Sequence, residues 1–185
     1  SRIRDLENPD YAIIDIDPSE KNTFDEVIEV AQAFHALFKR AKIPGYCKTS
    51  GASGLHIYIP LGAKYTYGEA RDFTKLICYY VLEQMPELTS MTRALKNRKG
   101  KIYLDYLQNR RGQTLAAAYC LRPKRGAPVS APLKWEEVKK GLKVADFNIH
   151  TMPSRLQETG DIFRPVAEKG IEMEKTLINL ENLKK

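Results

Sequence analysis

The chain has 185 residues, of which 43% are hydrophobic and 29% charged, so it can bury the core of one domain and is not a disordered tail. No apolar run approaches the roughly 18–20 residues of a membrane-spanning helix, and the N-terminal sequence SRIRDLENPD has no apolar signal segment. Three cysteines without a C-x-x-C pair argue against a structural zinc site or a disulfide framework, and favour reduced thiols in the cytoplasm.

The positive charge is concentrated in one part of the chain. The net charge is +7, and residues 93–125 contain ten Lys and Arg but only one acid, Asp105. A concentrated positive field suits phosphate-rich partners such as nucleic acids or nucleotides. A solvated basic surface is the simpler alternative. A carboxylate among so many cations is either neutralised by them or serves to hold a metal near a polyanion.

The first predicted strand carries two acids on one face. Residues 11–17 (YAIIDID) read as a strand whose alternation puts Asp15 and Asp17 on one side and two isoleucines on the other. Residues 23–42 read as an amphipathic helix that starts with capping-box spacing and is followed by a Pro-Gly stop.

The next segment predicts a hairpin and a second helix. Residues 46–49 and 55–61 read as two strands joined by the turn SGASG. In the second of these strands, His56 lies on the face opposite to the leucine and isoleucine side chains. Residues 67–85 repeat the capping-box spacing and carry one apolar stripe, which predicts a helix.

A fourth strand completes a known arrangement. Residues 101–107 (KIYLDYL) read as a strand with Asp105 opposite to the apolar side chains. The resulting order, β-α-β-β-α-β, is that of ferredoxin-like and RNA-recognition-motif folds, and it predicts the α+β class. Both helices would cover one face of an antiparallel sheet. The other face would be open and would carry four polar side chains: Asp15, Asp17, His56 and Asp105.

The pattern is weaker after residue 114. Residues 115–121 are apolar and suit either a strand or a helix. Short helices are predicted at 133–142 and 152–157, and residues 167–185 read as a terminal helix or a linker. We therefore expect a mostly irregular or helical C-terminal extension of the core.

The predicted open face has the chemistry of a metal site. Hard divalent cations such as Mg²⁺ and Mn²⁺ prefer carboxylate oxygens. Asp15 and Asp17 would lie roughly 7 Å apart along the strand, and Asp105 from a neighbouring strand would complete a site for two ions. Such a pair of ions activates an attacking oxygen and stabilises a leaving one in phosphoryl transfer. A lone Asp-x-Asp pair would otherwise be two solvated acids at a strand end.

Several residues near these acids could contact phosphates. The turn at 50–54 can bring backbone N–H groups to phosphate oxygens, although an ordinary hairpin turn has the same sequence. His56 could donate a hydrogen bond to a phosphate or be a structural residue. Arginines bind phosphates as a bidentate fork, or serve only solubility. The candidates that flank the acid are Arg98, Gln108 and Arg122.

Four segments resemble one known family in sequence and order. YAIIDIDP, KTSGASGLHIYIPL and KIYLDYLQN resemble the three motifs of archaeo-eukaryotic primases and, more narrowly, those of the polymerase domain of bacterial DNA ligase D. AYCLRPKRGAPVSAPLKWEEV is similar to the segment that follows the third motif in that family. The resemblance covers about residues 8–165.

The resemblance implies a template-directed nucleotidyltransferase, a primase-polymerase that adds NTPs or dNTPs to DNA ends in non-homologous end-joining repair. It implies two Mn²⁺ or Mg²⁺ ions bound by Asp15, Asp17 and Asp105. It also implies DNA ends, Ku and a DNA ligase as partners, with no membrane, at the nucleoid of a bacterial cytoplasm. The residues that it assigns to nucleotide binding are Ser50, Gly51, Ser53, His56, Arg98, Gln108 and Arg122.

Two departures from the family pattern affect this interpretation. Ser53 stands where many relatives carry Lys, so one phosphate contact is missing or supplied elsewhere. Family domains have on the order of a hundred residues before the first motif, in keeping with a large single domain, whereas this chain has ten. We therefore expect residues 1–165 to form a catalytic core without the usual N-terminal portion, and residues 166–185 to form a C-terminal helix or linker.

Two other functions use the same residues. A truncated core could be a non-catalytic nucleic-acid-binding module that keeps only the basic surface. A metal-dependent nuclease could use the same carboxylates for hydrolysis. Both stay open at the level of the sequence.

Overall fold

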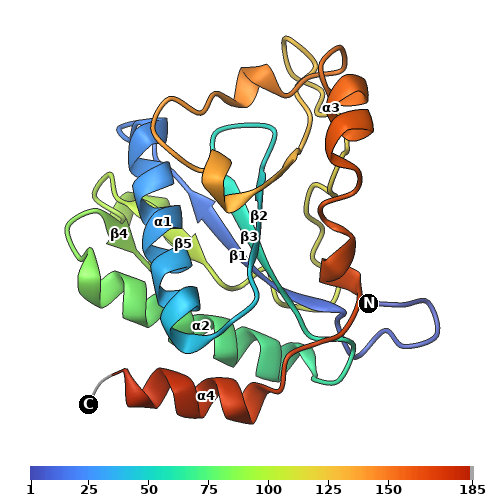
Figure 1. The fold of residues 1–185 in the computed structure, drawn as a ribbon. Coiled ribbons are helices and arrows are strands. Elements are labelled where there is room, and N and C mark those ends of the chain that lie inside the picture. The colour runs from blue at the N-terminus through green and yellow to red at the C-terminus, as the bar shows by residue number, and fades with distance from the viewer. Residues whose placement is uncertain (184–185) are drawn as a thin grey trace.

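The computed structural model describes residues 1–183, which form one mixed sheet with two long helices on one face (Figure 1). The strands are β1 (Tyr11–Asp17), β2 (Tyr46–Thr49), β3 (Leu55–Pro60), β4 (Thr89–Ser90), β5 (Ile102–Asp105) and β6 (Pro132–Leu133). The helices are α1 (Phe24–Ala41), α2 (Tyr67–Gln84), α3 (Met152–Thr159) and α4 (Met173–Asn182). Short 3-10 helices lie at Leu95–Asn97, Trp135–Glu137, Val144–Asp146 and Arg164–Ala167.

The sheet has the strand order β4-β5-β1-β3-β2-β6, and only the β4–β5 pair is parallel. The four central strands are those that the sequence predicts, in the β-α-β-β-α-β order, so the α+β class is confirmed. The edge strands β4 and β6 were not predicted, because two residues are too few to show an alternating pattern.

Both long helices begin where their capping residues predict. The Thr23 hydroxyl accepts from the Glu26 backbone N–H, and the Glu26 carboxylate accepts from the Thr23 backbone N–H. Thr66 and Glu69 form the same pair at the start of α2. Each helix buries one apolar stripe against the sheet, where the β1 side chains alternate between buried and half-buried.

The second face of the sheet is less open than predicted. His56 and Tyr58 are only 4% exposed, because the segments that follow β5 fold back over β3. The ring of Phe163 packs edge-on against Tyr58, with 5.0 Å between the ring centroids. The half of this face around Asp15 and Asp105 stays partly exposed. The segments that follow β5 therefore leave a hollow beside β1.

Two predictions for the region after β5 are wrong. Residues 115–121 form neither a strand nor a helix. The end of this segment pairs irregularly with residues 128–130, with one isolated bridge between Leu121 and Val129. The predicted helix at 133–142 is only a 3-10 turn. Trp135 within it stacks on His35 and donates a hydrogen bond to the carbonyl oxygen of Gly45.

The C-terminal helix α4 lies across α1 and α2 (Figure 1). Leu180 is fully buried, and its carbonyl oxygen accepts from the Tyr80 hydroxyl at 2.9 Å. The predicted helix at 152–157 is confirmed as α3. The last two residues of the predicted segment 167–185 lie outside the described residues, and the division into 1–165 and 166–185 stays a prediction. No helix within residues 1–183 has the length and apolar character needed to cross a membrane.

Candidate active site

A row of four polar side chains crosses the sheet on the face opposite to α1 and α2. Strand pairing places Lys48 of β2 opposite His56 of β3, His56 opposite Asp15 of β1, and Asp15 opposite Asp105 of β5. Directly paired residues point to the same face of a sheet. Asp17 follows two residues after Asp15 and shares that face. The prediction that the three aspartates and His56 share one face is therefore confirmed.

The three carboxylates suit a divalent cation. The pKa of Asp15 is raised to about 7, first by burial and then by the negative charges of Asp17 and Asp105. A bound Mg²⁺ or Mn²⁺ would offset both effects, and its preferred ligands are carboxylate oxygens. Within residues 1–183, however, no three acidic, His or Cys side chains are grouped closely enough to hold one ion as they lie.

Asp105 is held by donors from its own segment. One carboxylate oxygen accepts from the Leu107 backbone N–H at 2.8 Å and from the Tyr103 hydroxyl at 3.2 Å. The other accepts from the Gln108 side-chain amide at 3.1 Å. The bond to Leu107 turns the chain after Asp105, which ends β5 two residues before the predicted end at residue 107.

Asp17 is paired with Arg98. An Arg98 Nη donates to the Asp17 carboxylate at 3.1 Å, and the guanidinium lies over the Tyr103 ring at 4.0 Å. Arg98 therefore neutralises Asp17 and does not line the cavity beside Asp15. An ion bound by Asp17 would have to compete with this pair.

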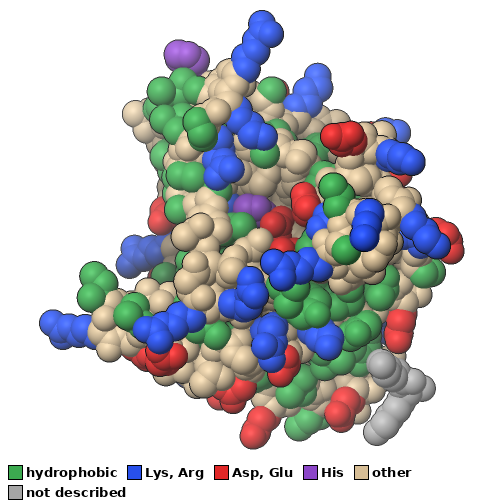
Figure 2. Space-filling view, turned by 180° about the vertical axis from the view of Figure 1, so that it is seen from behind, with side chains coloured by type: hydrophobic (Ala, Val, Ile, Leu, Met, Phe, Trp, Pro, Cys, Tyr) green, Lys and Arg blue, Asp and Glu red, His purple; other side chains and the backbone are tan. Residues whose placement is uncertain are grey.

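A cavity of about 460 Å³ opens beside Asp15. It brings together four of the residues that the sequence singled out, Asp15, Ser50, His56 and Arg122, with a wall from residues 114–116. Seen from behind the view of Figure 1, a hollow contains a histidine and carboxylates and is surrounded by Lys and Arg side chains (Figure 2). A negatively charged ligand with its own cation would suit this arrangement.

Two glycines let the turn at 50–54 approach the cavity. A Cβ on Gly54 would lie 2.3 Å from the backbone oxygen of Ile16, and one on Gly51, where φ is +69°, would lie 2.4 Å from Arg122 Cγ. The Ser50 hydroxyl oxygen accepts from the backbone N–H groups of residues 52 and 54, which closes the turn. Ser53 is exposed and lies beside a different cavity, so the structure does not bring it together with the others.

Two buried polar atoms at the site have no partner. Within residues 1–183, neither Arg122 Nε nor Gln108 Oε1 makes a hydrogen bond. Buried polar groups are nearly always satisfied, so an orphaned donor and acceptor at a cavity point to a ligand that is polar. Arg122 lines the cavity beside Asp15.

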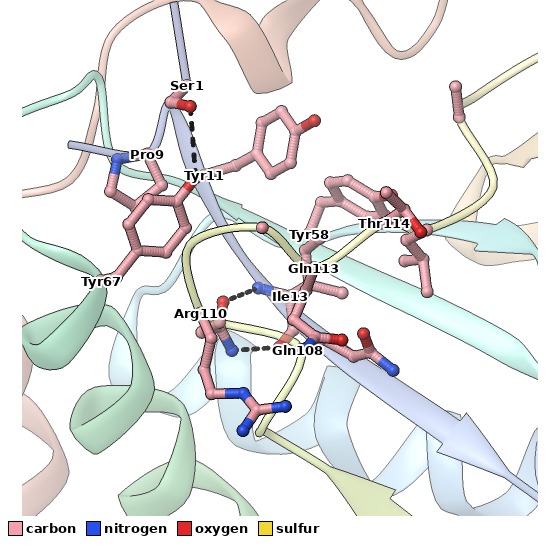
Figure 3. A pocket seen from close by; sticks show the side chains of 14 residues that line it. Ser1, Pro9, Tyr11, Ile13, Tyr58, Tyr67, Gln108, Arg110, Gln113 and Thr114 are labelled. Atoms are coloured by element: carbon pink, nitrogen blue, oxygen red, sulfur yellow. Dashed lines mark hydrogen bonds between the residues drawn. The ribbon is translucent and has the colours of Figure 1, made fainter. Parts of the chain in front are cut away.

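A second cavity has a volume of about 350 Å³ (Figure 3). Side chains from β1 (Tyr11), β3 (Tyr58) and the segment after β5 (Gln108, Arg110) surround it. Thr114 and Leu115 line both cavities, so the two together form a longer groove on this face. The groove offers aromatic and amide groups next to the charged ones.

The comparisons with known proteins point to one family. Residues 1–163 match the family described as "LigD, primase-polymerase domain". The chain belongs to this family. The resemblance predicted from the motifs is therefore confirmed, and it extends over most of the chain.

Curated relatives and a solved structure agree with the family. The chain is 39% identical over 153 residues to the bifunctional non-homologous end joining protein LigD of Bacillus subtilis, covering 82% of this chain and 25% of that protein. It is 34% identical over 156 residues to the multifunctional LigD of Pseudomonas aeruginosa, covering 84% of this chain and 19% of the relative. The chain thus spans a quarter or less of these relatives.

The polymerase domain of Mycobacterium tuberculosis ligase D, solved in complex with DNA, has a similar fold. The TM-score is 0.80 at 27% sequence identity, and the alignment covers 89% of this chain and 57% of that one. The α+β fold is therefore that of the LigD polymerase domain.

Sequence reasoning missed Lys48 of this LigD-type domain. Its side chain is fully buried, and its Nζ lies 2.9 Å from His56 Nδ1 and in hydrogen-bond contact with Ser130 Oγ. Burial lowers the pKa of Lys48 to about 8, so the amine stays charged at neutral pH. The strand pattern contained the signal, since in the predicted hairpin Lys48 pairs with His56.

The pKa of His56 is lowered far below its ordinary value, which favours the neutral ring at neutral pH. Burial, followed by the charges of Lys48 and Arg122, lowers the pKa of His56 to about 2. Its Nε2 lies 3.4 Å from an Asp15 oxygen. The ring therefore acts through one N–H donor and one lone pair, not as a cation.

Asn109 was also missed, although it lies in a quoted motif. Its amide group donates to the Ile13 carbonyl at 2.7 Å and accepts from the Ile13 N–H at 2.8 Å, so it continues the pairing of β1 beyond the end of β5. The same amide donates to Thr74 Oγ1 at 3.0 Å. Asn109 thereby fixes the segment that carries Gln108 against β1.

Asn109→Ala should lower the free energy of unfolding by about 2 kcal/mol, because it leaves both backbone groups of Ile13 unpaired in a partly buried place. Urea unfolding followed by circular dichroism measures the change. Asn97→Ala, at an exposed position, is the matched control. Equal stability of the two variants would contradict the role given to Asn109.

Gly54→Ala should destabilise the turn by about 1–3 kcal/mol, because the added methyl group would overlap the Ile16 backbone oxygen. Gly68→Ala is the control, since its methyl group would meet nothing closer than 3.7 Å. Thermal unfolding of both variants tests this. A Gly54→Ala protein as stable as wild type would show that the turn does not need its close approach to β1.

Proposed function

We propose that this chain is the catalytic core of a template-directed nucleotidyltransferase that transfers nucleotides from nucleoside triphosphates to the 3′ ends of broken DNA, with release of pyrophosphate, during non-homologous end joining. The observation that carries the proposal is the row of paired strands that puts Asp15, Asp105 and His56 on one face, beside a cavity that Arg122 also lines. The names of the relatives, end-joining proteins and a polymerase domain in complex with DNA, support it.

The acidic residues would hold two divalent ions. Bound to Asp15, Asp17 and Asp105, Mg²⁺ or Mn²⁺ would assist attack of the primer 3′-hydroxyl on the α-phosphorus and stabilise the departing pyrophosphate. The raised pKa of Asp15 supports this assignment, since its causes are burial and two neighbouring carboxylates. The carboxylates act here as ligands and do not need to donate protons.

The other residues of the cavity would bind the triphosphate. Arg122 can offer its guanidinium to phosphate oxygens, which would also satisfy its unpaired Nε. The Ser50 hydroxyl and the Gly51 backbone lie at the same cavity or next to it, and a hydroxyl keeps a hydrogen to donate. Gln108 would position Asp105 through the hydrogen bond from its side-chain amide. Arg98 would position Asp17 and neutralise part of its charge.

The DNA would lie along the basic loops around this face. Most of the Lys and Arg between residues 93 and 125 are exposed, on the loops that precede and follow β5. Their charge suits the phosphate backbone of a primer and template. The relatives' names refer to end joining and to a complex with DNA, so we place the action at DNA ends. The family resemblance adds Ku and a DNA ligase as proposed partners, and the bacterial nucleoid as the proposed place.

Asp15→Ala, Asp17→Ala and Asp105→Ala should each lower nucleotide addition at least about a hundredfold, because two-metal stabilisation supplies several kcal/mol. Extension of a labelled recessed DNA end with NTPs and Mn²⁺ measures this. Asp72→Ala, an exposed acid on α2, is the control and should keep full activity. DNA affinity should change little in all four proteins.

The same assay separates the rival functions. Shortening of the labelled strand by wild-type protein would indicate a metal-dependent nuclease. DNA binding without extension, and without metal-dependent affinity for triphosphate, would indicate a non-catalytic binding module. Wild-type extension by any one of the three aspartate variants would contradict the assigned ligand role.

Arg122→Ala should raise the KM for the nucleoside triphosphate about tenfold or more while changing DNA affinity much less, because a charge-assisted contact to phosphate is lost. Lys140→Ala, at an exposed cation outside the basic segment 93–125, is the control and should change neither quantity. Steady-state extension kinetics and DNA-binding anisotropy give the two quantities. An unchanged KM would show that Arg122 does not contact the nucleotide.

A further inference from the structure

Lys48 is a buried ammonium group with three hydrogen-bond partners. Its Nζ contacts the Thr49 carbonyl oxygen at 3.4 Å, His56 Nδ1 at 2.9 Å, and Ser130 Oγ. The Ser130 hydroxyl donates its own hydrogen to the Thr49 carbonyl at 2.7 Å, so its oxygen is an acceptor toward Lys48. An ammonium has three donors and no lone pair, and these three contacts account for all of them.

The burial of this charge needs a reason. Lysine is almost never fully buried unless it is paired, and within residues 1–183 no carboxylate lies within ion-pair distance of Lys48. The hydrogen bonds offset only part of the cost of removing the charge from water. Its side chain points along the row of paired residues, toward His56 and then Asp15.

The donor inventory decides which nitrogen of His56 carries the proton. Lys48 can only donate, so His56 Nδ1 must accept and the proton of the neutral ring must lie on Nε2. Nε2 is the nitrogen that faces the cavity, 3.4 Å from an Asp15 oxygen. In the other tautomer, Nε2 would carry a lone pair, which would repel a phosphate bound in the cavity.

We propose that Lys48 is a positioning residue that holds His56 in its Nε2–H tautomer, so that the ring presents a hydrogen-bond donor to a phosphate of the incoming nucleotide. The phosphate contact rests on the proposed function. The tautomer is a property of the free protein and does not depend on that function. Lys48 does not touch the ligand, since its side chain is fully buried.

The first test reads the tautomer of the wild-type protein directly. Long-range ¹H–¹⁵N correlation spectra of the metal-free full chain distinguish Nδ1–H from Nε2–H in each of the three histidines. A His56→Ala variant assigns the signal. We expect His56 to be a single Nε2–H species. An Nδ1–H species or a mixture of the two would overturn the proposal without any lysine variant.

The second test removes the ammonium. Lys48→Met keeps the unbranched side chain, shorter by one atom, and removes all donors. We expect the His56 signal to change to that of a mixture of tautomers. We also expect the KM for the triphosphate to rise about tenfold, which is the effect of losing one charge-assisted hydrogen bond. Lys140→Met, at an exposed lysine, is the control and should change neither quantity.

A double-mutant cycle separates positioning from an independent effect. In the His56→Ala background, Lys48→Met should raise the KM no further, because Lys48 acts through His56. Additive effects, or an unchanged His56 tautomer in Lys48→Met, would overturn the proposal. If Lys48→Met does not fold, the wild-type spectrum is the test, and an Nδ1–H or mixed His56 signal overturns the proposal. If wild-type protein adds no nucleotides, the proposed function fails while the spectrum still tests the tautomer.

Discussion

The site depends on the antiparallel pairing of β1 with β3 on one side and with β5 on the other. Together with the β2–β3 hairpin, this register brings Lys48, His56, Asp15 and Asp105 into one row across the sheet. A shift of one residue in either pairing would move a whole strand's polar side chains to the face that α1 and α2 cover. The buried isoleucines of β1 and β3 stabilise the register, because a shift would expose them.

The charges along this row follow a consistent order. The buried cation of Lys48 lies at one end, next to the neutral imidazole of His56, and the carboxylates lie at the other end. Arg98 forms an ion pair with one of these carboxylates, Asp17. Burial raises the pKa of Asp15 and lowers those of Lys48 and His56, so each group is shifted toward its neutral form. Such a set is poised for ligands that bring both negative phosphates and their own cations.

Local patterns predicted the central fold, and long-range contacts account for what they missed. Alternation and capping residues identified β1, β2, β3, β5 and both long helices, and they placed the three aspartates on one face. The burial of β3 by later segments such as the one that carries Phe163 was not predicted, because it depends on contacts between residues far apart in the sequence. Asn109 was missed because its importance comes from Ile13 on another strand and not from its own neighbours. Lys48 could have been found, because the predicted hairpin pairs it with His56.

The central claim is that the three aspartates share divalent ions, and electron paramagnetic resonance of bound Mn²⁺ tests it most directly. With a non-hydrolysable triphosphate present, the account predicts two ions per chain whose spins are coupled, and loss of that coupled signal when Asp15, Asp17 and Asp105 are all replaced by Asn. Bound ions without spin coupling, or a coupled signal that survives the triple replacement, would contradict it.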